Sequence, residues 1–439
     1  MIELQEVWQD VLLGDERYFK LATGGTPSTE KKEYWENGTI PWLSSGEVHK
    51  KIIRVADGRI TEKGFQHSNA RFYPSHSILI ALAGQGKTRG TTAITEIEAT
   101  SNQSIAAIIP NKELVEPYFV YYYLDSLYQE LRSISAGAGR AGLSLSILAD
   151  VSIKLPDKSI QERIAAVLSC IDRAIEQTEA IIAKQQRIKT GLMQDLLTKG
   201  IDEQGNIRSE ETHEFKDSPL GNIPKEWNAA TIDEITTHVG SGITPKGGSS
   251  VYESEGIVFI RSQNVYDDGL RLDDIAYINE RINKQMKRSQ VLANDVLLNI
   301  TGASIGRCCC VPLGFPRSNV NQHVCIIRLN DANEFDAFFL ATVLSSPIGQ
   351  TQIKSLNAGS NREGLNYQQI KNMIVPIPSN KEERSDISKR LMKQSEDIKR
   401  QQIQLEKMKR IKHGLMQDLL TGKVSVEALL ESEHSTVRA

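Results

Sequence analysis

The most constraining feature of this sequence is a long string that occurs twice. RIKTGLMQDLLT fills residues 187–198 and returns as RIKHGLMQDLLT at residues 410–421, with only Thr190 and His413 differing. The two strings are 223 residues apart, a repeat far longer than the units that build solenoids. Each copy is therefore large enough to hold its own core. We therefore expect two tandem copies of one plan, a globular segment followed by a long helix. Other landmarks keep a shift of 218 to 223 residues: Gly84 with Gly302, Gly137 with Gly359, and Pro156 with Pro378.

Composition narrows the class of protein. The 439 residues are 39% hydrophobic and 24% charged, as in an ordinary globular protein. No apolar run long enough to span a membrane and no secretion signal stand out, so we expect a cytoplasmic protein. The five cysteines lack the paired spacing of a zinc site and are expected to be reduced residues of the core or of strands. Because the net charge is only −3, any surface for nucleic acid must be local.

The pattern within the first copy predicts a mixture of strands and helices. Residues 77–83 read as a strand, and a Gly-rich turn and a second β-rich run at 91–97 follow, which predicts a hairpin. Residues 117–134 begin with a proline and carry apolar residues at helical spacing. The aromatic residues of this helix could stack on bases, but we favour packing in a core, and we expect the matching helix of the second copy to begin near Phe335.

Each copy ends in a long helix. Residues 159–197 contain no proline, and apolar or small residues recur at steps of three and four, the heptad pattern of a coiled coil. The second copy repeats this pattern up to Leu419. About 38 helical residues make a rod on the order of 55 Å long. Between the copies, residues 201–227 are polar and mostly acidic, with Pro219 and Pro224 among them, which is typical of a linker.

The string Gly86-Lys87-Thr88 matches the end of a phosphate-binding loop. The full motif needs a glycine five residues earlier, where Ala81 stands, and the second copy has no Lys-Thr pair in its equivalent loop. A glycine-bearing basic hairpin loop suits a nucleic-acid backbone better, because its amides can approach phosphates. A plain hairpin turn with solvated charges is the alternative. The candidate DNA contacts in the two loops are Gly84, Gln85, Lys87, Thr88, Arg89, Ser304 and Arg307.

An Asn-Gln pair precedes the next expected strand in each copy. These residues are Asn102 and Gln103 in the first copy, and Asn321, Gln322 and His323 in the second. Asn and Gln can bind adenine with two hydrogen bonds, and they also cap turns. Because the pair recurs while base-reading residues should differ, we favour a structural role and keep DNA binding as the alternative.

Two further pairs of segments are candidates for DNA contact. Arg140 and Arg362 lie in matching Gly-rich loops, either as phosphate contacts or as exposed loop arginines. The segment WLSSGEV of the first copy and the corresponding segment FIRSQNV of the second copy carry different side chains. This is expected if the two segments contact different bases. The residues at that place are Ser44, Ser45, Arg261, Gln263 and Asn264.

No catalytic constellation is evident. The eight histidines are scattered without metal-ligand spacing, and neither a nucleophile elbow nor a dinucleotide-binding motif follows a strand. We expect the chain to hold no metal and to catalyse nothing alone.

Taken together, the sequence resembles the specificity subunit of Type I restriction-modification enzymes. The resemblance covers essentially the whole chain. It departs at the N-terminus, where the first copy starts abruptly with MIELQEVWQDVLLGD while the second copy has the full lead-in NIPKEWNAATIDEI, so we expect the first domain to be slightly shorter. The motifs that carry it are both GLMQDLLT helix ends, SPLGNIPKEW at 218–227, the loops at Gly84 and Gly302, residues 321–323, and QERIAAVL at 161–168.

The resemblance implies a function and a set of partners. Each globular segment would be a target recognition domain that reads one half of a bipartite DNA target. The helices would pack antiparallel, set the spacer and dock two modification subunits, which bind S-adenosylmethionine and methylate adenine. Restriction subunits would use ATP and magnesium to translocate and cleave DNA, and this chain would bind no cofactor. The expected docking residues are Gly191, Leu192, Met193, Leu196, Gly414, Leu415, Met416 and Leu419.

The predicted fold class is thus α+β, with two tandem mixed α/β recognition domains separated by two long helices that form an antiparallel coiled coil. The rival functions are a coiled-coil interaction scaffold without DNA readout and, less favoured, a P-loop hydrolase. The predicted segments are recognition domain 1 at 1–156, the central helix at 157–200, a linker and entry at 201–227, recognition domain 2 at 228–378, the C-terminal helix at 379–423, and a tail at 424–439.

Overall fold

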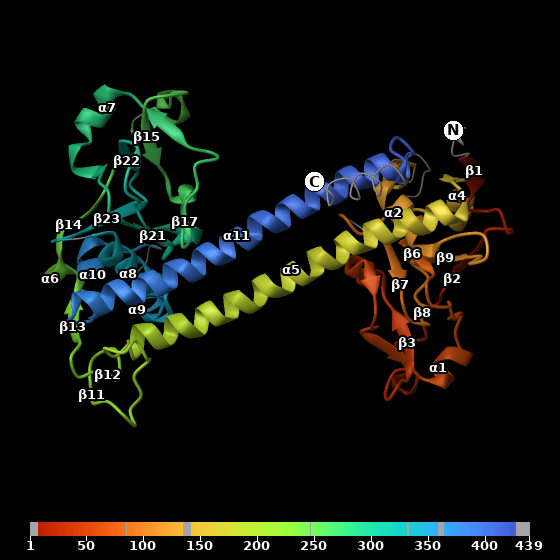
Figure 1. Cartoon of the computed structure of the whole chain (residues 1–439), viewed down its shortest axis with the longest axis horizontal. Coiled ribbons are helices and arrows are strands. Elements are labelled where there is room, and N and C mark those ends of the chain that lie inside the picture. The colour runs from red at the N-terminus through yellow and green to blue at the C-terminus, as the bar shows by residue number, and fades with distance from the viewer. Residues whose placement is uncertain are drawn as a thin grey trace, which may run out of the picture. The chain divides into compact units, whose positions relative to one another are not determined.

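The structure is a computed structural model that describes residues 8–84, 86–134, 142–245, 247–331, 333–358 and 364–426. The chain divides into two compact units. Unit 1 comprises residues 1–179 and 403–439, and unit 2 comprises residues 180–402. Each unit combines one globular segment with parts of both long helices (Figure 1). Strands and helices are mixed in both units, which confirms the α+β class. No helix in the described part of the chain is long and apolar enough to cross a membrane.

Unit 1 contains a five-stranded sheet, a three-stranded sheet and the two-stranded pair of β1 and β10. Its strands are β1 (Gln9–Leu12), β2 (Phe19–Thr23), β3 (Ile40–Leu43), β4 (Ile52–Ile53), β5 (Gly58–Ile60), β6 (Ile78–Ala81), β7 (Thr92–Thr95), β8 (Thr100–Ser101), β9 (Ile105–Pro110) and β10 (Ser152–Leu155). The larger sheet has the order β2-β9-β6-β7-β4, and the smaller has the order β5-β3-β8. Its helices are η1 (Lys32–Tyr34), η2 (Ser45–Lys50), α1 (Glu62–Gln66), α2 (Pro117–Ser126), α3 (Tyr128–Ile134) and α4 (Leu145–Ala149).

Two predictions for unit 1 can be compared directly with its elements. Strands β6 and β7 pair antiparallel, which confirms the predicted hairpin. The helix predicted at 117–134 is two helices, α2 and α3, separated at Leu127. The Ser126 hydroxyl donates to the Tyr123 carbonyl at 2.6 Å, a side-chain bond of the kind that competes with helix continuation. The aromatic residues of α2 lie mostly in the core, as predicted: Phe119, Tyr121 and Tyr122 are buried.

Unit 2 contains the second set of strands. They are β11 (Phe215–Lys216), β12 (Ile223–Pro224), β13 (Asn228–Thr231), β14 (Thr236–Ser241), β15 (Ile257–Ile260), β16 (Val265–Tyr266), β17 (Gly269–Leu270), β18 (Ala276–Ile278), β19 (Gln290–Val291), β20 (Val296–Asn299), β21 (Cys308–Cys310), β22 (Ser318–Val320), β23 (Val324–Leu329) and β24 (Ile374–Ile377). The helices are α6 (Ile232–Ile235), η3 (Gly248–Val251), η4 (Ser262–Asn264), α7 (Glu280–Gln285), η5 (Lys287–Ser289), η6 (Gly302–Ser304), α8 (Glu334–Ser345), α9 (Pro347–Ala358) and α10 (Tyr367–Lys371).

The duplication of the sequence is also a duplication of topology. The order β14-β23-β20-β21 in unit 2 repeats β2-β9-β6-β7 in unit 1. The order β18-β15-β22 repeats β5-β3-β8, including the parallel pairing of its second and third strands. The antiparallel pairs β1-β10 and β13-β24 each join the lead-in of a repeat to the strand before its long helix. One strand plan therefore carries two different sets of loops.

The long helices are α5 (Lys158–Thr198) and α11 (Lys381–Leu420). In unit 1, the Lys412 ammonium lies 2.6 Å from Asp172 and the Lys409 ammonium lies 2.9 Å from Glu179. Because the residue numbers of α11 fall as those of α5 rise, the two helices run antiparallel within this unit. Leu391 and Ile387 of α11 enter the core of unit 2.

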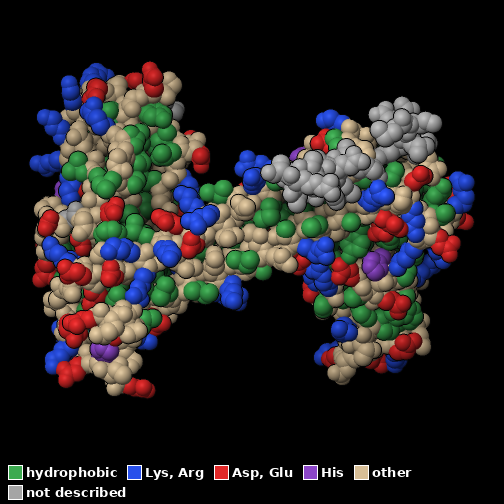
Figure 2. Space-filling view, in the orientation of Figure 1, with side chains coloured by type: hydrophobic (Ala, Val, Ile, Leu, Met, Phe, Trp, Pro, Cys, Tyr) green, Lys and Arg blue, Asp and Glu red, His purple; other side chains and the backbone are tan. Residues whose placement is uncertain are grey.

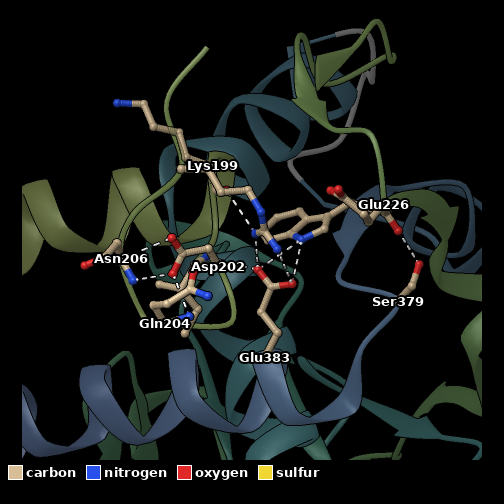
Figure 3. A network of polar contacts seen from close by, with 10 residues as sticks. Lys199, Asp202, Gln204, Asn206, Glu226, Ser379 and Glu383 are labelled. Atoms are coloured by element: carbon tan, nitrogen blue, oxygen red, sulfur yellow. Dashed lines mark hydrogen bonds and ion pairs between the residues drawn. The ribbon is translucent and has the colours of Figure 1, made fainter. Parts of the chain in front are cut away.

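The linker between the repeats is tied to the first turn of α11 by Glu383 (Figure 3). The Arg208 guanidinium donates to both carboxylate oxygens at 2.5 and 3.2 Å, and the Trp227 indole donates to them at 3.2 Å. The Ile201 amide donates at 3.0 Å. Arg208 and Glu383 side chains are only 10% and 7% exposed. The linker predicted from composition is therefore anchored at both of its ends, and it contains the β11-β12 hairpin.

Candidate nucleic-acid interface

The first candidate loop, residues 84–90, joins β6 to β7 in unit 1. Gly84 and Gly86 have φ of 128° and 74°, a backbone conformation that favours glycine. The loop's carbonyls are held from α3: the Tyr128 hydroxyl donates to the Lys87 carbonyl at 2.9 Å, and the Arg132 guanidinium donates to the Gly86 carbonyl at 2.5 Å. The Lys87 side chain is exposed. The carbonyls of Gly86 and Lys87 are thus held in place, while the Lys87 ammonium forms no ion pair within the described part of the chain, an arrangement suited to a phosphate group.

The same loop does not have the context of a nucleotide-binding P-loop. That motif lies between a strand and the helix it opens, whereas this loop joins two antiparallel strands. Thr88 is half-buried, and its hydroxyl lies 3.2 Å from the His49 ring. Arg89 is half-buried as well. Three of the predicted contacts, Gln85, Arg140 and Arg362, lie outside the described residues.

In unit 2, Asn299 brings two candidate segments together. This buried residue ends β20, and its amide donates to the Ser262 carbonyl at 2.8 Å and to the Ser304 hydroxyl at 3.1 Å. It therefore joins the segment 261–264 to the loop 302–307. Sequence reasoning missed Asn299, although an amide that ends the apolar strand VLLN, where the first copy has Ala81, was a usable signal.

Within the segment 261–264, the side chains have different roles. Asn264 is only 2% exposed, and its amide donates to the carbonyls of Arg271 and Asp274 at 3.0 and 3.2 Å. This corrects the expectation that Asn264 faces DNA, because both of its amide hydrogens are directed to the backbone. The Arg261 guanidinium donates to the Asp274 carbonyl at 2.8 Å, and Gln263 donates to the Asp274 carboxylate at 2.5 Å. Asp274 therefore orients both side chains, and each keeps further hydrogen-bonding groups that the bonds to Asp274 do not use.

The corresponding segment of unit 1 is also a capped turn. The Ser44 amide donates to the Glu47 carboxylate at 3.0 Å, as the Arg261 amide donates to Asn264 in unit 2. Glu47 is buried and also accepts from Lys50 at 2.9 Å. Ser44 and Ser45 are half-buried. The two repeats thus share a turn but differ in the side chains it carries.

Two arginines share one aromatic ring beside the loop 302–307. The Arg307 guanidinium carbon lies 4.7 Å from the Tyr266 ring centroid, and that of Arg271 lies 5.1 Å away. Arg271 also donates to Asp268 at 2.6 Å. A ring face attracts a guanidinium and limits its motion, so Tyr266 holds two cations at the edge of the candidate site. Figure 2 shows basic and acidic side chains intermixed on the visible face of each unit, so surface charge alone does not mark this site.

We expect Tyr266→Ala to weaken DNA binding by roughly fivefold, because one cation–π contact at an exposed site is worth about 1 kcal/mol. Tyr266→Phe retains the ring face and should bind as the unchanged chain does. Equilibrium binding of the assembled complex to its target DNA measures the difference. Equal weakening by both substitutions would assign the effect to the hydroxyl and contradict the role of the ring.

The Asn-Gln pairs make the same kind of bond in both repeats. Each asparagine accepts a hydrogen bond from the backbone amide two residues ahead. Each glutamine accepts one from the segment that follows β2 in unit 1 or β14 in unit 2. These contacts tie a turn to its neighbour, and whether the side chains also contact bases stays a prediction. The pairs are Ser104 to Asn102 at 3.1 Å, His323 to Asn321 at 3.0 Å, Thr26 to Gln103 at 2.7 Å, and Thr244 to Gln322 at 3.3 Å. His323 also lies 2.5 Å from the Thr301 hydroxyl.

Each repeated GLMQDLL string is partly inside a core, with its last two leucines buried. Leu196 belongs to the core of unit 2, and Met416 and Leu419 belong to the core of unit 1. This corrects the expectation that these three side chains dock a partner, because their surfaces are already covered within their own units. In both strings the final pair of leucines belongs to the core of its own unit. Leu192, Met193 and Leu415 are partly buried against the same cores, while Gly191 and Gly414 have open space beside them.

Exposed apolar residues of the long helices are better docking candidates. Sequence reasoning missed them because it counted such residues toward the helix seam or passed over them. Exposed isoleucines offer apolar surface to another helix, and Ile188 and Ile411 each lie three residues before a glycine that has open space beside it. On α5 in unit 2 they are Ile181 and Ile188, 45% and 50% exposed; on α11 in unit 1 they are Ile403 and Ile411, 63% and 44% exposed.

The cysteines and other potential metal ligands offer no reactive cluster in the described residues. No three His, Cys, Asp or Glu side chains gather there as a metal site. All five cysteines are free, and Cys308, Cys309 and Cys325 are buried, as expected of core thiols. Cys170 is exposed, which differs from that expectation. Burial raises the pKa of the Cys325 thiol to about 12 and raises the pKa of Cys308 as well.

Comparison with known proteins finds a matching protein family and several proteins of similar sequence. The family described as Type I restriction modification DNA specificity domain matches residues 6–185 and 224–407. The chain is 27% identical over 421 residues to the Type I restriction enzyme MjaIX specificity subunit of Methanocaldococcus jannaschii, covering 93% of this chain and 92% of that protein. It is 30% identical over 152 residues to the EcoR124I/EcoR124II specificity subunit of Escherichia coli, covering 34% and 37% of the two chains.

Solved structures show the same fold. The S subunit of a Type I restriction-modification system from M. genitalium matches with a TM-score of 0.61 at 17% identity, covering 95% of this chain and 97% of that one. A chain from a study of complex assembly and conformational transition of the type I R-M system matches with a TM-score of 0.53 at 16% identity, covering 94% and 97%.

Proposed function

The chain belongs to the Type I restriction-modification DNA specificity family, and from this premise we propose that it is the specificity subunit that directs such a complex to its DNA target. The matched family covers both repeats separately, and this is the observation that carries the proposal. Each recognition domain reads one half of a bipartite target through side chains in the DNA grooves, while basic loop residues fix its register on phosphates.

The difference between the loops of the two repeats supports two different half-sites. The strand order is the same in both units, but the loops that it carries differ. In the loop between β6 and β7 unit 1 presents Lys87, whereas in the corresponding loop between β20 and β21 unit 2 presents Arg307 on Tyr266. A symmetric target would call for identical loops, so the proposed target is asymmetric.

The partners follow from the same proposal. Two modification subunits bind the exposed isoleucine faces of α5 and α11, and restriction subunits complete the complex. S-adenosylmethionine, ATP and magnesium act on those partners, and this chain supplies recognition without catalysis. In this assignment α5 and α11 set the spacer between the half-sites.

An exchange of recognition domains tests the proposal. Residues 1–156 are replaced by the equivalent segment of a relative, and adenine methylation is mapped across a genome in cells that also supply the modification subunits. We expect one half-site to change and the other to stay. A change in both half-sites, or a continuous palindromic target, would contradict it. Sequence-specific DNA binding by the assembled complex would exclude the rival scaffold function. Binding of DNA without any sequence preference would overturn the proposal.

Charge reversal in the two loops should weaken binding without changing the sequence preference. Each of Lys87→Glu and Arg307→Glu removes one cation expected at a phosphate, so the slope of log affinity against log salt should fall by about 1 for each. Lys354→Glu, at an exposed position on α9, is the matched control. The measurement is a salt titration of the complex on target and random DNA. A loss confined to the target sequence would instead assign these residues to base readout.

A further inference from the structure

The internal repeat provides a comparison for Lys189. Lys189 and Lys412 hold the same position in the two RIK strings. In unit 1, the Lys412 ammonium lies 2.6 Å from the Asp172 carboxylate and 5.3 Å from the Tyr122 ring centroid. The Tyr122 hydroxyl donates to the same carboxylate at 2.8 Å. The lysine of unit 1 is therefore neutralised inside its own unit.

The lysine of unit 2 lacks such a partner. With the shift of 223 residues that relates Lys189 to Lys412, the position of Asp172 becomes residue 395, which is Ser395. The Ser395 hydroxyl donates to the carbonyl one turn earlier in α11, at 2.7 Å. Among the described residues Lys189 makes no ion pair, and burial lowers the pKa of its ammonium.

Other charged side chains line the same space as Lys189. Asp267 accepts from the Cys308 amide at 3.0 Å, and Asp268 is bonded to Arg271 at 2.6 Å. Glu396 and Lys399 of α11 also face this space and offset each other in charge. Asp268 and Asp267 lie close enough to offset part of the lowering that burial causes in the pKa of the half-buried Lys189 ammonium, but no carboxylate of the described residues forms an ion pair with it.

A cavity of about 530 Å³ adjoins Lys189 within unit 2. Its volume lies in the range of small-molecule sites, roughly 300–1,000 Å³. Apolar walls with a few polar groups at one end are the usual construction of such sites. Its apolar lining residues include Met193, Phe338, Leu391 and Met392, and its polar lining residues include Lys189, Ser395, Asp267, Asp268 and Glu396.

We propose that this cavity binds a small aliphatic carboxylate, whose carboxyl group pairs with Lys189 as Asp172 pairs with Lys412 in unit 1. The aliphatic chain of the ligand lies on the apolar walls. The β16-β17 turn, residues 267–269, forms part of the cavity and directly follows Tyr266, so the ligand contacts the turn that carries the paired arginines. The site does not depend on the proposed DNA-binding function.

Calorimetric titration of the full chain with octanoate tests the proposal, with 1-octanol as the neutral probe of equal length. We expect one octanoate per chain and at least tenfold weaker binding of octanol. Ser395→Asp supplies the carboxylate of unit 1 to unit 2 and should reduce octanoate affinity at least tenfold while raising the unfolding temperature. Lys189→Met should also lose octanoate, whereas Lys184→Met, at an exposed position of α5, should not.

Equal binding of octanoate and octanol would overturn the proposal, and so would full octanoate affinity in Ser395→Asp. Failure of the unchanged chain to bind octanoate would overturn it as well. If, in that case, Lys189→Met loses the modification subunit, the lysine belongs to a protein interface. Because the titration uses no DNA, its failure leaves the specificity function standing, and a failed domain exchange leaves the carboxylate site standing.

Discussion

Replacing Glu383 by alanine should remove about 3–5 kcal/mol from the free energy of unfolding of unit 2. The substitution leaves the Arg208 guanidinium buried without its counter-ion, and removing one partner of a buried ion pair is far more costly than the pair is worth. It also leaves the Trp227 indole and the Ile201 amide without their acceptor. The linker should then detach from α11 at both of its ends.

Denaturant unfolding of the full chain, followed by the fluorescence of the fully buried Trp227, measures this loss. Glu382→Ala removes an exposed acid one residue away and should change stability by less than about 0.5 kcal/mol. A double substitution, Arg208→Met with Glu383→Leu, should recover much of the loss, because no unpaired charge stays buried. A loss below about 1 kcal/mol for Glu383→Ala would show that water or a rearranged side chain replaces the carboxylate.

Glu383 also shows where sequence reasoning stops. It stands in the run KEER, where nothing distinguishes it from its exposed neighbour Glu382. Its burial arises because a segment more than 150 residues away in sequence, containing Arg208 and Trp227, folds over it. Contacts of that range leave no periodicity in a single sequence, so the linker could be located from its composition while its anchor could not.

The repeat was predictable because two near-identical strings can be found by comparing the sequence with itself. The hairpin of β6 and β7 and the long helices were predictable because strand pattern and heptad spacing are both read within a short window. The misassigned residues are those whose chemistry suits two roles. An asparagine amide can bind adenine or a backbone carbonyl, and Asn264 binds carbonyls. A leucine can dock a partner or fill a core, and Leu196 fills a core. Only the fold decides between such roles.

Removing seven residues from both long helices should abolish methylation of the original target. Residues 177–183 of α5 and 400–406 of α11 occupy equivalent repeat positions, and a deletion of seven keeps the heptad phase. Seven helical residues span about 10.5 Å, or roughly 3 base pairs of B-DNA. If the helices set the spacer, a domain shifted by that amount also faces the duplex at a different angle, since a turn takes about 10.5 base pairs.

Any target still methylated by this variant should keep both half-sites and have a shorter spacer. The control removes residues 177–183 alone, which staggers the antiparallel helices by two turns. That variant should lose cooperative folding, while the double deletion should retain it. Genome-wide adenine methylation and thermal unfolding supply the two readouts. Continued methylation of the original spacing by a folded double-deletion variant would mean that the helices do not measure the spacer, and that the separation of the half-sites is set by the partners or by the DNA itself.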